Sequence, residues 1–220
     1  MKHFKAVLFD FDGTLVRSMK DLFRAWRFVM ANHGIKIRPE DYYPFEGLRG
    51  PEVAEHFLKR YGSNQADPET LAKEKEVRYL KGHRLKLYPG VNSLLRALRK
   101  NGVPAAIVTA GFKERVQRSL PEGFLGAFDA MVTGEKTKRG KPFPDPYLAG
   151  AKMLGFKPSQ CIVVENAPLG IESAKRAGCY CVAIASTLDE NYLRKADEIV
   201  GRFSDLKSLS VVKALLKRKP

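Results

Sequence analysis

From residue 88 onward, short apolar runs alternate with amphipathic stretches, and no other feature of the chain limits its possible folds as strongly. Short apolar runs indicate buried strands, and apolar residues three and four positions apart indicate helices. Strands that alternate with helices pair in parallel, and the helices cover both faces of the sheet. We therefore expect an α/β fold with a doubly wound parallel sheet. The expected strands are residues 105–109, 130–133, 161–164, 181–184 and 198–200, and the expected helices are residues 92–101, 113–120, 146–154 and 170–177.

One more apolar run, at residues 6–9, is followed by two aspartates, Asp10 and Asp12, and then by Gly13. In an open α/β sheet, ligands bind outside the carboxyl ends of the strands, which is where these carboxylates would lie. Two acids so close together repel each other unless a cation or a shared proton relieves the repulsion. The alternative is an Asp-Gly turn in which the aspartates only cap the backbone.

The segment between the first strand and residue 88 has a helical pattern and no convincing strand. This insertion predicts two domains. Residues 1–16 and 88–220 would form the α/β core, and residues 17–87 would form an all-helical cap with hinges near residues 15–18 and 87–90. The expected cap helices lie around residues 22–30, where Gly34 ends the helix, and around residues 51–61 and 69–82.

The charge of the chain is unusual, because 39 basic and 24 acidic residues give a formal net charge of +15. Such a charge is one signature of nucleic-acid binding. The basic residues are spread along the whole chain, however, and no aromatic residues are interleaved with them. We therefore do not expect a nucleic-acid partner, although a basic nucleic-acid-associated protein stays open as an alternative class. Two local clusters of basic residues stand out. The first is Lys136, Lys138, Arg139 and Lys141. The second is Lys213, Lys217, Arg218 and Lys219, which we expect at a solvated helix end, where cations interact favourably with the helix dipole.

Compartment and assembly are constrained by what the sequence lacks. No stretch approaches the ~20 apolar residues of a membrane span, and no secretory apolar region precedes the first strand. Cys161, Cys179 and Cys181 have apolar neighbours, which predicts buried free thiols rather than a disulfide framework. We expect a cytoplasmic protein without membrane association, either a monomer or a weak dimer.

Polar residues also follow the second strand. Thr109, Ala110 and Gly111 place a hydroxyl and a turn of small residues before a helix, where backbone N–H groups can hold an anion. The alternative for Thr109 is a simple helix N-cap.

Two later strands end in polar groups as well. Lys141 lies among the prolines of Gly-Lys-Pro-Phe-Pro-Asp-Pro, which suits a rigidly aimed cation, although an isolated lysine there would be read as part of a solvated basic loop. Glu165 and Asn166 follow the fourth strand and offer the oxygen ligands that a hard cation accepts. The alternative for Asn166 is a helix cap.

Together these positions form a coherent phosphoryl-transfer site. Such a reaction needs a nucleophile, an acid/base and neutralisation of the phosphate oxygens. Asp10 can be the nucleophile, Asp12 the acid/base, and Lys141 the fixed cation, while Thr109 and the nearby backbone amides donate hydrogen bonds. A Mg²⁺ ion would offset the accumulated negative charge. Its expected ligands are Asp10, Asp12, Glu165 and Asn166.

Four motifs in this order resemble those of the haloacid dehalogenase superfamily of phosphohydrolases: DFDGT at residues 10–14, IVTAG at 107–111, GKPFPDPY at 140–147 and VVENAPLGIESAKRAG at 163–178. The resemblance covers the α/β part from about residue 4 to 205. It implies that Asp10 forms an aspartyl-phosphate, that Asp12 protonates the leaving oxygen and then activates water, and that Asp10 and the backbone carbonyl of Asp12 bind Mg²⁺. The helical cap is similar to that of the subfamily of β-phosphoglucomutase and phosphoglycolate phosphatase.

Two positions depart from the family pattern. Asn166 stands where the family usually has a second acid, so we expect weaker Mg²⁺ affinity and a greater importance of Glu165. Arg17-Ser18 stands where Asp-Ser is common, and the sequence offers no account of this change.

The motifs also favour a phosphatase reaction over the dehalogenase and mutase reactions of the family. Asp12 argues against a dehalogenase, which lacks the second aspartate, and Thr14 favours a phosphatase over a mutase, which tends to have Val there. The loop at residues 45–51 resembles the substrate-specificity loop of the family, and we expect Arg49 to contact the substrate, although an exposed surface arginine is the alternative. Thr14, Ala110 and Gly111 are the other expected substrate contacts.

The predicted function is therefore Mg²⁺-dependent hydrolysis of a small phosphorylated metabolite, such as a sugar phosphate or phosphoglycolate. The cap would close over the site and exclude water while Asp10 is phosphorylated. A phosphomutase of the β-phosphoglucomutase type is the alternative.

Overall fold

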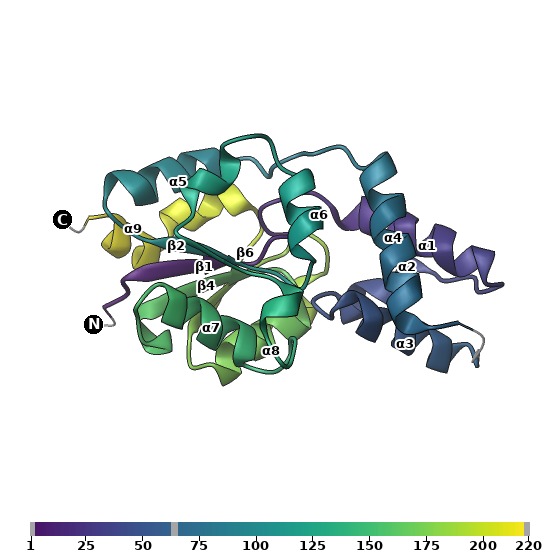
Figure 1. Ribbon diagram of the computed structural model, residues 1–220. Helices are drawn as coiled ribbons and strands as arrows, with labels where there is room; N and C mark the ends of the chain where they lie inside the picture. The colour runs from purple at the N-terminus through teal and green to yellow at the C-terminus, as the bar shows by residue number, and fades with distance from the viewer. Residues whose placement is uncertain (1–2, 63–65, 218–220) are drawn as a thin grey trace.

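The computed structural model describes residues 3–62 and 66–217, which form an α/β part and a group of helices beside it (Figure 1). The helices α1–α4, which we call the cap helices, follow the first strand in the sequence. Both termini lie at the end of the α/β part that is far from the cap helices (Figure 1). The cap helices are α1 (Met19–Asn32), α2 (Pro39–Tyr42), α3 (Gly50–Arg60) and α4 (Pro68–Gly82).

The sheet has six parallel strands in the order β3-β2-β1-β4-β5-β6, which confirms the predicted doubly wound α/β fold. The strand order changes direction at β1, so the carboxyl end of β1 lies at the switch point where such sheets bind ligands. Phe9 pairs with Ile107 of β2 and with Val164 of β4, so the residues that follow the three strands lie level with one another. The strands are β1 (Ala6–Phe9), β2 (Ala105–Val108), β3 (Ala130–Val132), β4 (Cys161–Glu165), β5 (Tyr180–Ile184) and β6 (Glu198–Val200).

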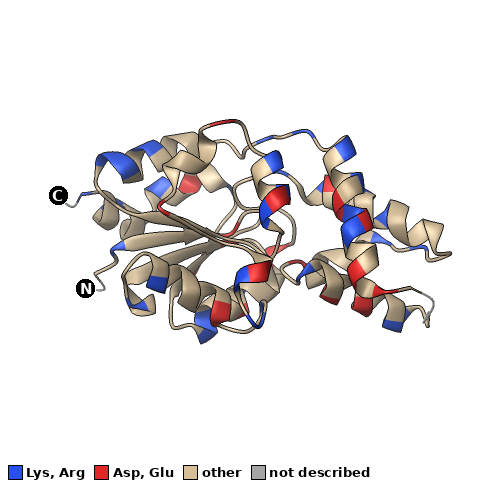
Figure 2. Cartoon of the chain, viewed as in Figure 1, with Lys and Arg blue, Asp and Glu red and all other residues tan. Residues whose placement is uncertain are grey.

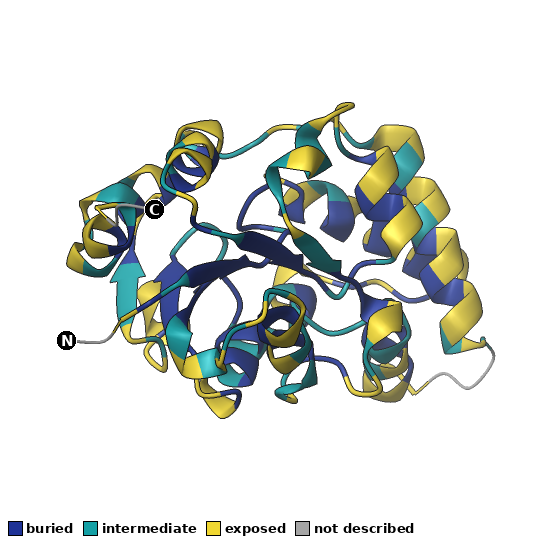
Figure 3. Cartoon of the chain, turned by 60° about the vertical axis from the view of Figure 1, so that its left-hand side comes forward, coloured by how far each residue is buried: buried dark blue, intermediate teal, exposed yellow. Residues whose placement is uncertain are grey.

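Helices cover both faces of this sheet (Figure 1). Side chains alternate along a strand, so Val7 and Phe9 pack in the apolar cluster of one face, and Ala6 and Leu8 in that of the other. The central strands are therefore buried on both sides, as Figure 3 shows. The first face is covered by α5 (Val91–Lys100) and α9 (Ser210–Leu216), the second by α7 (Asp145–Met153) and α8 (Pro168–Arg176), and α6 (Lys113–Arg118) follows β2.

The cap helices have an apolar core of their own. Trp26 of α1 and Phe57 of α3 contact each other edge to face with ring centroids 5.6 Å apart, and both side chains are almost fully buried. Leu71 and Tyr79 of α4 belong to the same cluster. A separate core is what allows such a unit to move as a body, but the predicted domain boundaries at residues 16/17 and 87/88 stay a prediction.

Backbone hydrogen bonds tie together the two segments that connect the parts. The N–H of Arg17 donates to the carbonyl of Lys86 at 2.8 Å, and the N–H of Tyr88 donates to the carbonyl of Leu15 at 3.0 Å. Val16 forms isolated bridges with Asp12 and Leu87, while the described residues between 15 and 87 form no named strand. These bonds hold the two connecting segments together beside the Asp10–Gly13 loop.

Small elements differ from the sequence expectations. Helix α2 has four residues and begins with a proline, so it is too short to give a periodic signal. The C-terminal helix α9 was expected only as a helix end. Lys213 lies in it and Lys217 directly follows it, whereas Arg218 and Lys219 lie outside the described residues.

The surface and the cysteines agree with the sequence analysis. Lys and Arg are spread over helices of both parts and do not form one stripe in the view of Figure 2. Cys161, Cys179 and Cys181 are free and buried, as predicted. In residues 3–62 and 66–217, no helix combines the length and the apolar character needed to cross a membrane.

Candidate active site

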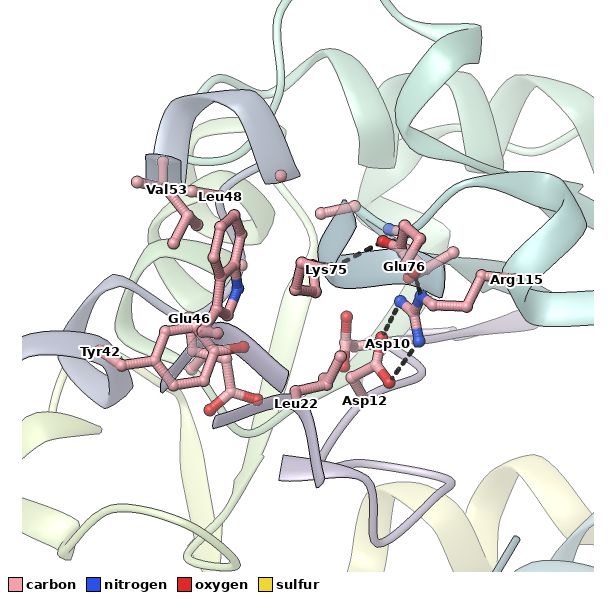
Figure 4. Close-up of a pocket in the computed structure, with 17 residues that line it drawn as sticks. Asp10, Asp12, Leu22, Tyr42, Glu46, Leu48, Val53, Lys75, Glu76 and Arg115 are labelled. Carbon is pink, nitrogen blue, oxygen red and sulfur yellow. Dashed lines mark hydrogen bonds and ion pairs between the residues drawn. The ribbon is translucent and has the colours of Figure 1, made fainter. Parts of the chain in front are cut away.

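A small pocket lies between the carboxyl ends of the strands and the cap helices, with a cavity volume of about 50 Å³ (Figure 4). The α/β part contributes its aspartates and the loop after β2, and the cap helices with their connecting loops contribute both apolar and charged side chains. In Figure 4, Glu46 approaches from one side of the pocket, and Asp10 and Asp12 lie on the other. The pocket lining includes Asp10, Asp12, Thr109, Ala110, Gly111 and Arg115 of the α/β part and Trp26, Glu46, Lys75 and Glu76 of the cap side.

Asp10 is held by a buried lysine. Nζ of Lys141 donates to Oδ1 of Asp10 at 2.6 Å and to Oε1 of Glu165 at 2.6 Å. Burial raises the pKa of Asp10 to about 7, because the opposing effect of the Lys141 ammonium is smaller and Glu165 adds repulsion. Burial alone would lower the pKa of Lys141, but the two carboxylates outweigh burial and raise it. Lys141 is therefore a permanent cation between two acids.

Glu165 is fully engaged by protein donors. Its Oε1 accepts from Lys141 and from the hydroxyl of Tyr147 at 2.8 Å. Its Oε2 accepts from the backbone N–H groups of Asn166 at 2.8 Å and Ala167 at 3.0 Å. Four hydrogen bonds therefore engage its oxygens, and Glu165 holds Lys141 in place, while its expected role as a metal ligand stays a prediction.

Asn166 links the fourth strand to the first motif and to the cap side. Its Oδ1 accepts from the hydroxyl of Thr14 at 2.9 Å, and its Nδ2 donates to Glu46 at 2.8 Å and to the hydroxyl of Thr187 at 3.3 Å. Thr14 is fully buried and does not line the pocket. Thr14 therefore orients Asn166, and the structure does not support the expected contact between Thr14 and a substrate.

Asp12 is bound by an arginine that the sequence analysis did not select. Arg115 donates from Nη1 to Oδ1 of Asp12 at 3.0 Å and from Nη2 to Oδ2 at 2.5 Å. The hydroxyl of Ser18 also donates to Oδ1 at 2.7 Å. Burial would raise the pKa of Asp12, but the Arg115 charge and these hydrogen bonds outweigh burial and lower it. Ser18 thus has a clear role, whereas nothing in the structure explains Arg17 before it.

The Arg115 guanidinium also reaches the cap side. Its Nε lies 3.1 Å from Oε2 of Glu76 on α4, and Nζ of Lys75 lies 2.6 Å from Oε1 of the same glutamate. Lys75 is almost fully buried and lies over the Trp26 ring. A chain of charges therefore runs from Asp12 through Arg115 to the cap helix α4 (Figure 4).

The turn after β2 lines the pocket with backbone and with one hydroxyl. The N–H of Gly111 donates to Oγ1 of Thr109 at 3.0 Å, so this N–H is occupied inside the turn. Thr109 is buried, and its hydroxyl proton is still available for donation. Ala110 lies between them in the pocket wall. Thr109 and Ala110 remain candidates for substrate contact, whereas Gly111 shapes the turn.

Arg49 does not line the pocket. Its guanidinium binds the carboxylate of Glu52 one turn along α3, and its Nη1 reaches the carbonyl of Lys138 at 3.5 Å. The backbone N–H of Arg49 also donates to Glu52 at 2.9 Å, which caps the helix. Arg49 thus fastens the cap loop to the α/β part, and the structure does not support the expected substrate contact.

Sequence reasoning missed the charged residues that other parts of the chain bring to the pocket, namely Glu46, Lys75, Glu76 and Arg115. Glu46 carried a weak signal, because it stands before Gly47 in the loop selected for substrate specificity. The other three lie in charged helices and look like ordinary surface residues in the sequence.

Comparison with known proteins identifies the family. Residues 4–178 match the family model described as haloacid dehalogenase-like hydrolase. The chain belongs to this family. It is 36% identical over 198 residues to Hexitol phosphatase A of Escherichia coli, covering 89% of this chain and 90% of that protein. It is 31% identical over 206 residues to Validoxylamine A 7'-phosphate phosphatase of Streptomyces hygroscopicus subsp. limoneus, covering 93% and 96%. These matches show a phosphatase of the haloacid dehalogenase-like family.

Solved structures agree on the fold. A β-phosphoglucomutase of Clostridium difficile superposes with a TM-score of 0.85 at 24% identity, covering 96% of this chain and 97% of that one. A hydrolase of the same family from Entamoeba histolytica superposes with a TM-score of 0.82 at 28% identity, covering 96% and 99%.

Proposed function

We propose that this phosphatase hydrolyses the phosphomonoester of a small polyol or sugar through a covalent intermediate on Asp10. The contact between Lys141 and Asp10 is the observation that carries the proposal. It orients a buried carboxylate in the pocket wall, and among the described residues no hydrogen bond reaches the second oxygen, Oδ2. A fixed carboxylate with one free oxygen is suited to attack phosphorus.

The reaction then proceeds in two steps. Oδ2 of Asp10 attacks phosphorus, and the bond from phosphorus to the ester oxygen breaks. Asp12 gives a proton to the departing alcohol, and it has to take up this proton before the step, because Arg115 lowers its pKa in the substrate-free pocket. Water next attacks the phosphorus of the aspartyl-phosphate, Asp12 takes a proton from that water, the bond from phosphorus to Oδ2 of Asp10 breaks, and inorganic phosphate leaves. Thr109 and the ammonium of Lys141 stabilise the charge on the phosphate oxygens during both steps.

Mg²⁺ is part of this proposal. When bound, it would neutralise the phosphate oxygens and reduce their repulsion from Asp10. The donors that fit are all oxygens: the carboxylate of Asp10, the carbonyl of Asp12 and the amide oxygen of Asn166. In the described part of the chain, no three His, Cys, Asp or Glu side chains form a metal group, so amide and carbonyl oxygens have to complete the site beside the carboxylates. The unpartnered, buried Oε2 of Glu46 beside Asn166 supports a cation at this place.

The substrate class is supported by the relatives and by the pocket. Hexitol phosphatase A, by its name, acts on hexitol phosphates, and Validoxylamine A 7'-phosphate phosphatase acts on validoxylamine A 7'-phosphate. The cavity of about 50 Å³ is too small to contain a sugar phosphate as it stands, so the cap helices have to move for entry. A compact substrate that is then enclosed fits this geometry.

The test is phosphate release from a panel of hexitol phosphates, sugar phosphates and phosphoglycolate, compared by kcat/KM. Asp10→Asn should lose at least about a thousandfold in kcat, whereas Asp189→Asn, an exposed carboxylate outside the site, should keep full activity. Full activity of Asp10→Asn would contradict the proposal. Conversion of a sugar phosphate into its isomer without phosphate release would identify a mutase instead.

The high positive charge requires a second measurement. Salt-dependent DNA binding that is strong, unchanged in Asp10→Asn and unaccompanied by phosphate release would favour a nucleic-acid-associated protein. We expect weak binding that disappears at physiological salt.

A further inference from the structure

Glu46 is a cap-side carboxylate in contact with the α/β part. It lies in the loop between the short 3₁₀ helix Tyr43–Phe45 and α3, and only 5% of its surface is exposed. Its Oε1 accepts from Nδ2 of Asn166, a residue 120 positions away in the sequence. The loop of the first motif is equally close, because a methyl group added to Gly13 would come within 2.9 Å of Oε1 of Glu46. Glu46 therefore packs against the same loop that presents Asp10 and Asp12.

The other oxygen of Glu46 lacks a partner. Its Oε2 is buried, and in residues 3–62 and 66–217 no donor lies within hydrogen-bond reach. A buried carboxylate oxygen without a partner is costly, so such an atom calls for an explanation. The absence of a protein donor points to a group that is not part of the chain.

The charges around Glu46 point to a cation. Three buried carboxylates, those of Glu46, Asp10 and Glu165, lie near one ammonium, that of Lys141, which is hydrogen-bonded to the latter two. The Arg115 guanidinium is engaged by Asp12 and Glu76. A cation at the Glu46 side of the pocket would therefore relieve the repulsion among these carboxylates.

Asn166 supplies an independent observation. It stands at the position where an acid was expected, and it contributes no charge. Glu46 contacts this residue directly, so the chain has a carboxylate at this place after all, supplied from the cap side. A substrate hydroxyl could also occupy Oε2, but it would not explain why the acid lies against Asn166 and Gly13.

We propose that Glu46 is a ligand of the divalent cation, and that it replaces from the cap side the charge that Asn166 lacks. This inference rests on the proposed Mg²⁺-dependent function. Because one ligand comes from the cap side and the others from the α/β part, cation binding favours the closed arrangement of the two parts. A cation whose ligands all came from one part would bind equally well with the cap open.

The experiment measures cation binding without turnover. Isothermal titration of Mg²⁺ and of Mn²⁺ into the substrate-free protein should show at least tenfold weaker binding for Glu46→Gln than for the native chain. Glu55→Gln is the matched control, because Glu55 lies on the adjacent helix α3 with an exposed carboxylate that pairs with Lys59. Its cation affinity should be unchanged.

Trp26 gives a second readout, because it is the one tryptophan of the 220-residue sequence and it lines the pocket. Mg²⁺ should change its fluorescence in the native chain and in Glu55→Gln, but not in Glu46→Gln at a saturating cation concentration. Moving the acid back to the α/β part provides the rescue. Glu46→Gln combined with Asn166→Asp should recover cation affinity without recovering the fluorescence response.

Two results would overturn this inference. One is a Glu46→Gln protein that binds Mg²⁺ within twofold of the native affinity, and the other is a raised KM with unchanged cation affinity, which would make Glu46 a substrate contact. The proposed function fails separately, if the native chain releases no phosphate in the presence of Mg²⁺. Glu46→Gln keeps the size of the side chain and its contact with Asn166, so thermal melting should show a folded protein. Asn166→Asp alone should tighten Mg²⁺ binding, because it adds a carboxylate to the site.

Discussion

Arg115 donates hydrogen bonds to Asp12 from Nη1 and Nη2, and its Nε lies 3.1 Å from Oε2 of Glu76. The acid/base candidate is therefore oriented by an arginine that also contacts the cap helix α4. A guanidinium can bind a carboxylate through two parallel hydrogen bonds, which an ammonium cannot do. The orientation of Asp12 thus depends on the shape of the Arg115 side chain as well as on its charge.

Replacement of Arg115 by lysine should reduce proton transfer to the leaving group. We expect kcat/KM for a hexitol phosphate to fall about tenfold to hundredfold, because misplacing Asp12 should remove part of the roughly 10²–10⁴-fold that acid–base catalysis contributes. The loss for p-nitrophenyl phosphate should be smaller, because its leaving group departs without a proton. Arg118→Lys, on the exposed side of the same helix, should change neither value. Equal losses on both substrates would contradict a positioning role for Arg115.

Removal of the Lys141 ammonium should destabilise the protein as well as inactivate it. Lys141→Met leaves the Asp10 and Glu165 carboxylates buried without their cation, and breaking a buried pair in this way costs about 3–5 kcal/mol. Urea unfolding measures the change, and Lys138→Met in the exposed part of the same loop should stay within about 0.5 kcal/mol. Adding Asp10→Asn to Lys141→Met should restore part of the loss. If the loss in free energy of unfolding of the double variant equals the sum of the losses of the two single variants, Asp10 and Lys141 are not coupled in this way.

The α/β part could be predicted well from the sequence, because each of its strands is indicated by residues that are neighbours in the chain. Each strand is a short apolar run, and the polar residue after it marks the ligand-binding edge of the sheet, as for Asp10 and Thr109. The all-parallel register then brings these residues together without further information. Helix α2, with four residues, is too short for such a signal.

The polar contacts within the site could not be predicted in the same way. Asp12 and Arg115 are 103 residues apart, and Asn166 and Glu46 are 120 residues apart, so no spacing rule connects them. Residue type makes the Glu165 carboxylate a candidate metal ligand, and only the structure shows that its oxygens accept from Lys141 and from three other donors. Residue type limits what a side chain can do, and the neighbours decide what it does.

Gly170 provides a test of the Glu165 arrangement. Alanine normally stabilises a helix interior relative to glycine by about 1 kcal/mol. At this position in α8, however, an added methyl group would lie 1.7 Å from Oε1 of Glu165 and would displace the carboxylate from Lys141. We therefore expect Gly170→Ala to destabilise the protein and to lower kcat. Gly82→Ala at the end of α4, where no atom lies within 4 Å, should be neutral or slightly stabilising in thermal melts. Similar melting curves for the two variants would refute the arrangement.

The three cysteines should be unreactive in the folded protein and should make its stability depend on pH in alkaline solution. Burial raises the pKa of Cys161 to about 11 and that of Cys179 to about 12. An unfolded thiol ionises near pH 8.5, so the unfolded chain loses these protons first. Stability is therefore unaffected by the thiols below about pH 8.5 and falls as the pH rises from there towards 11.

A thiol reagent at pH 8 should therefore modify the native protein very slowly, and it should modify three groups once a denaturant has unfolded the chain. Urea unfolding at pH 8 and at pH 10 measures the change in stability. Cys161→Ala should show a smaller decrease between these two values than the native chain does, because one of the ionising groups is gone. The comparison separates the thiols from lysines and tyrosines, which titrate in the same range in both proteins. Rapid modification of the native protein at pH 8 would mean that the thiols are exposed to solvent, and the alkaline decrease in stability would then have another origin.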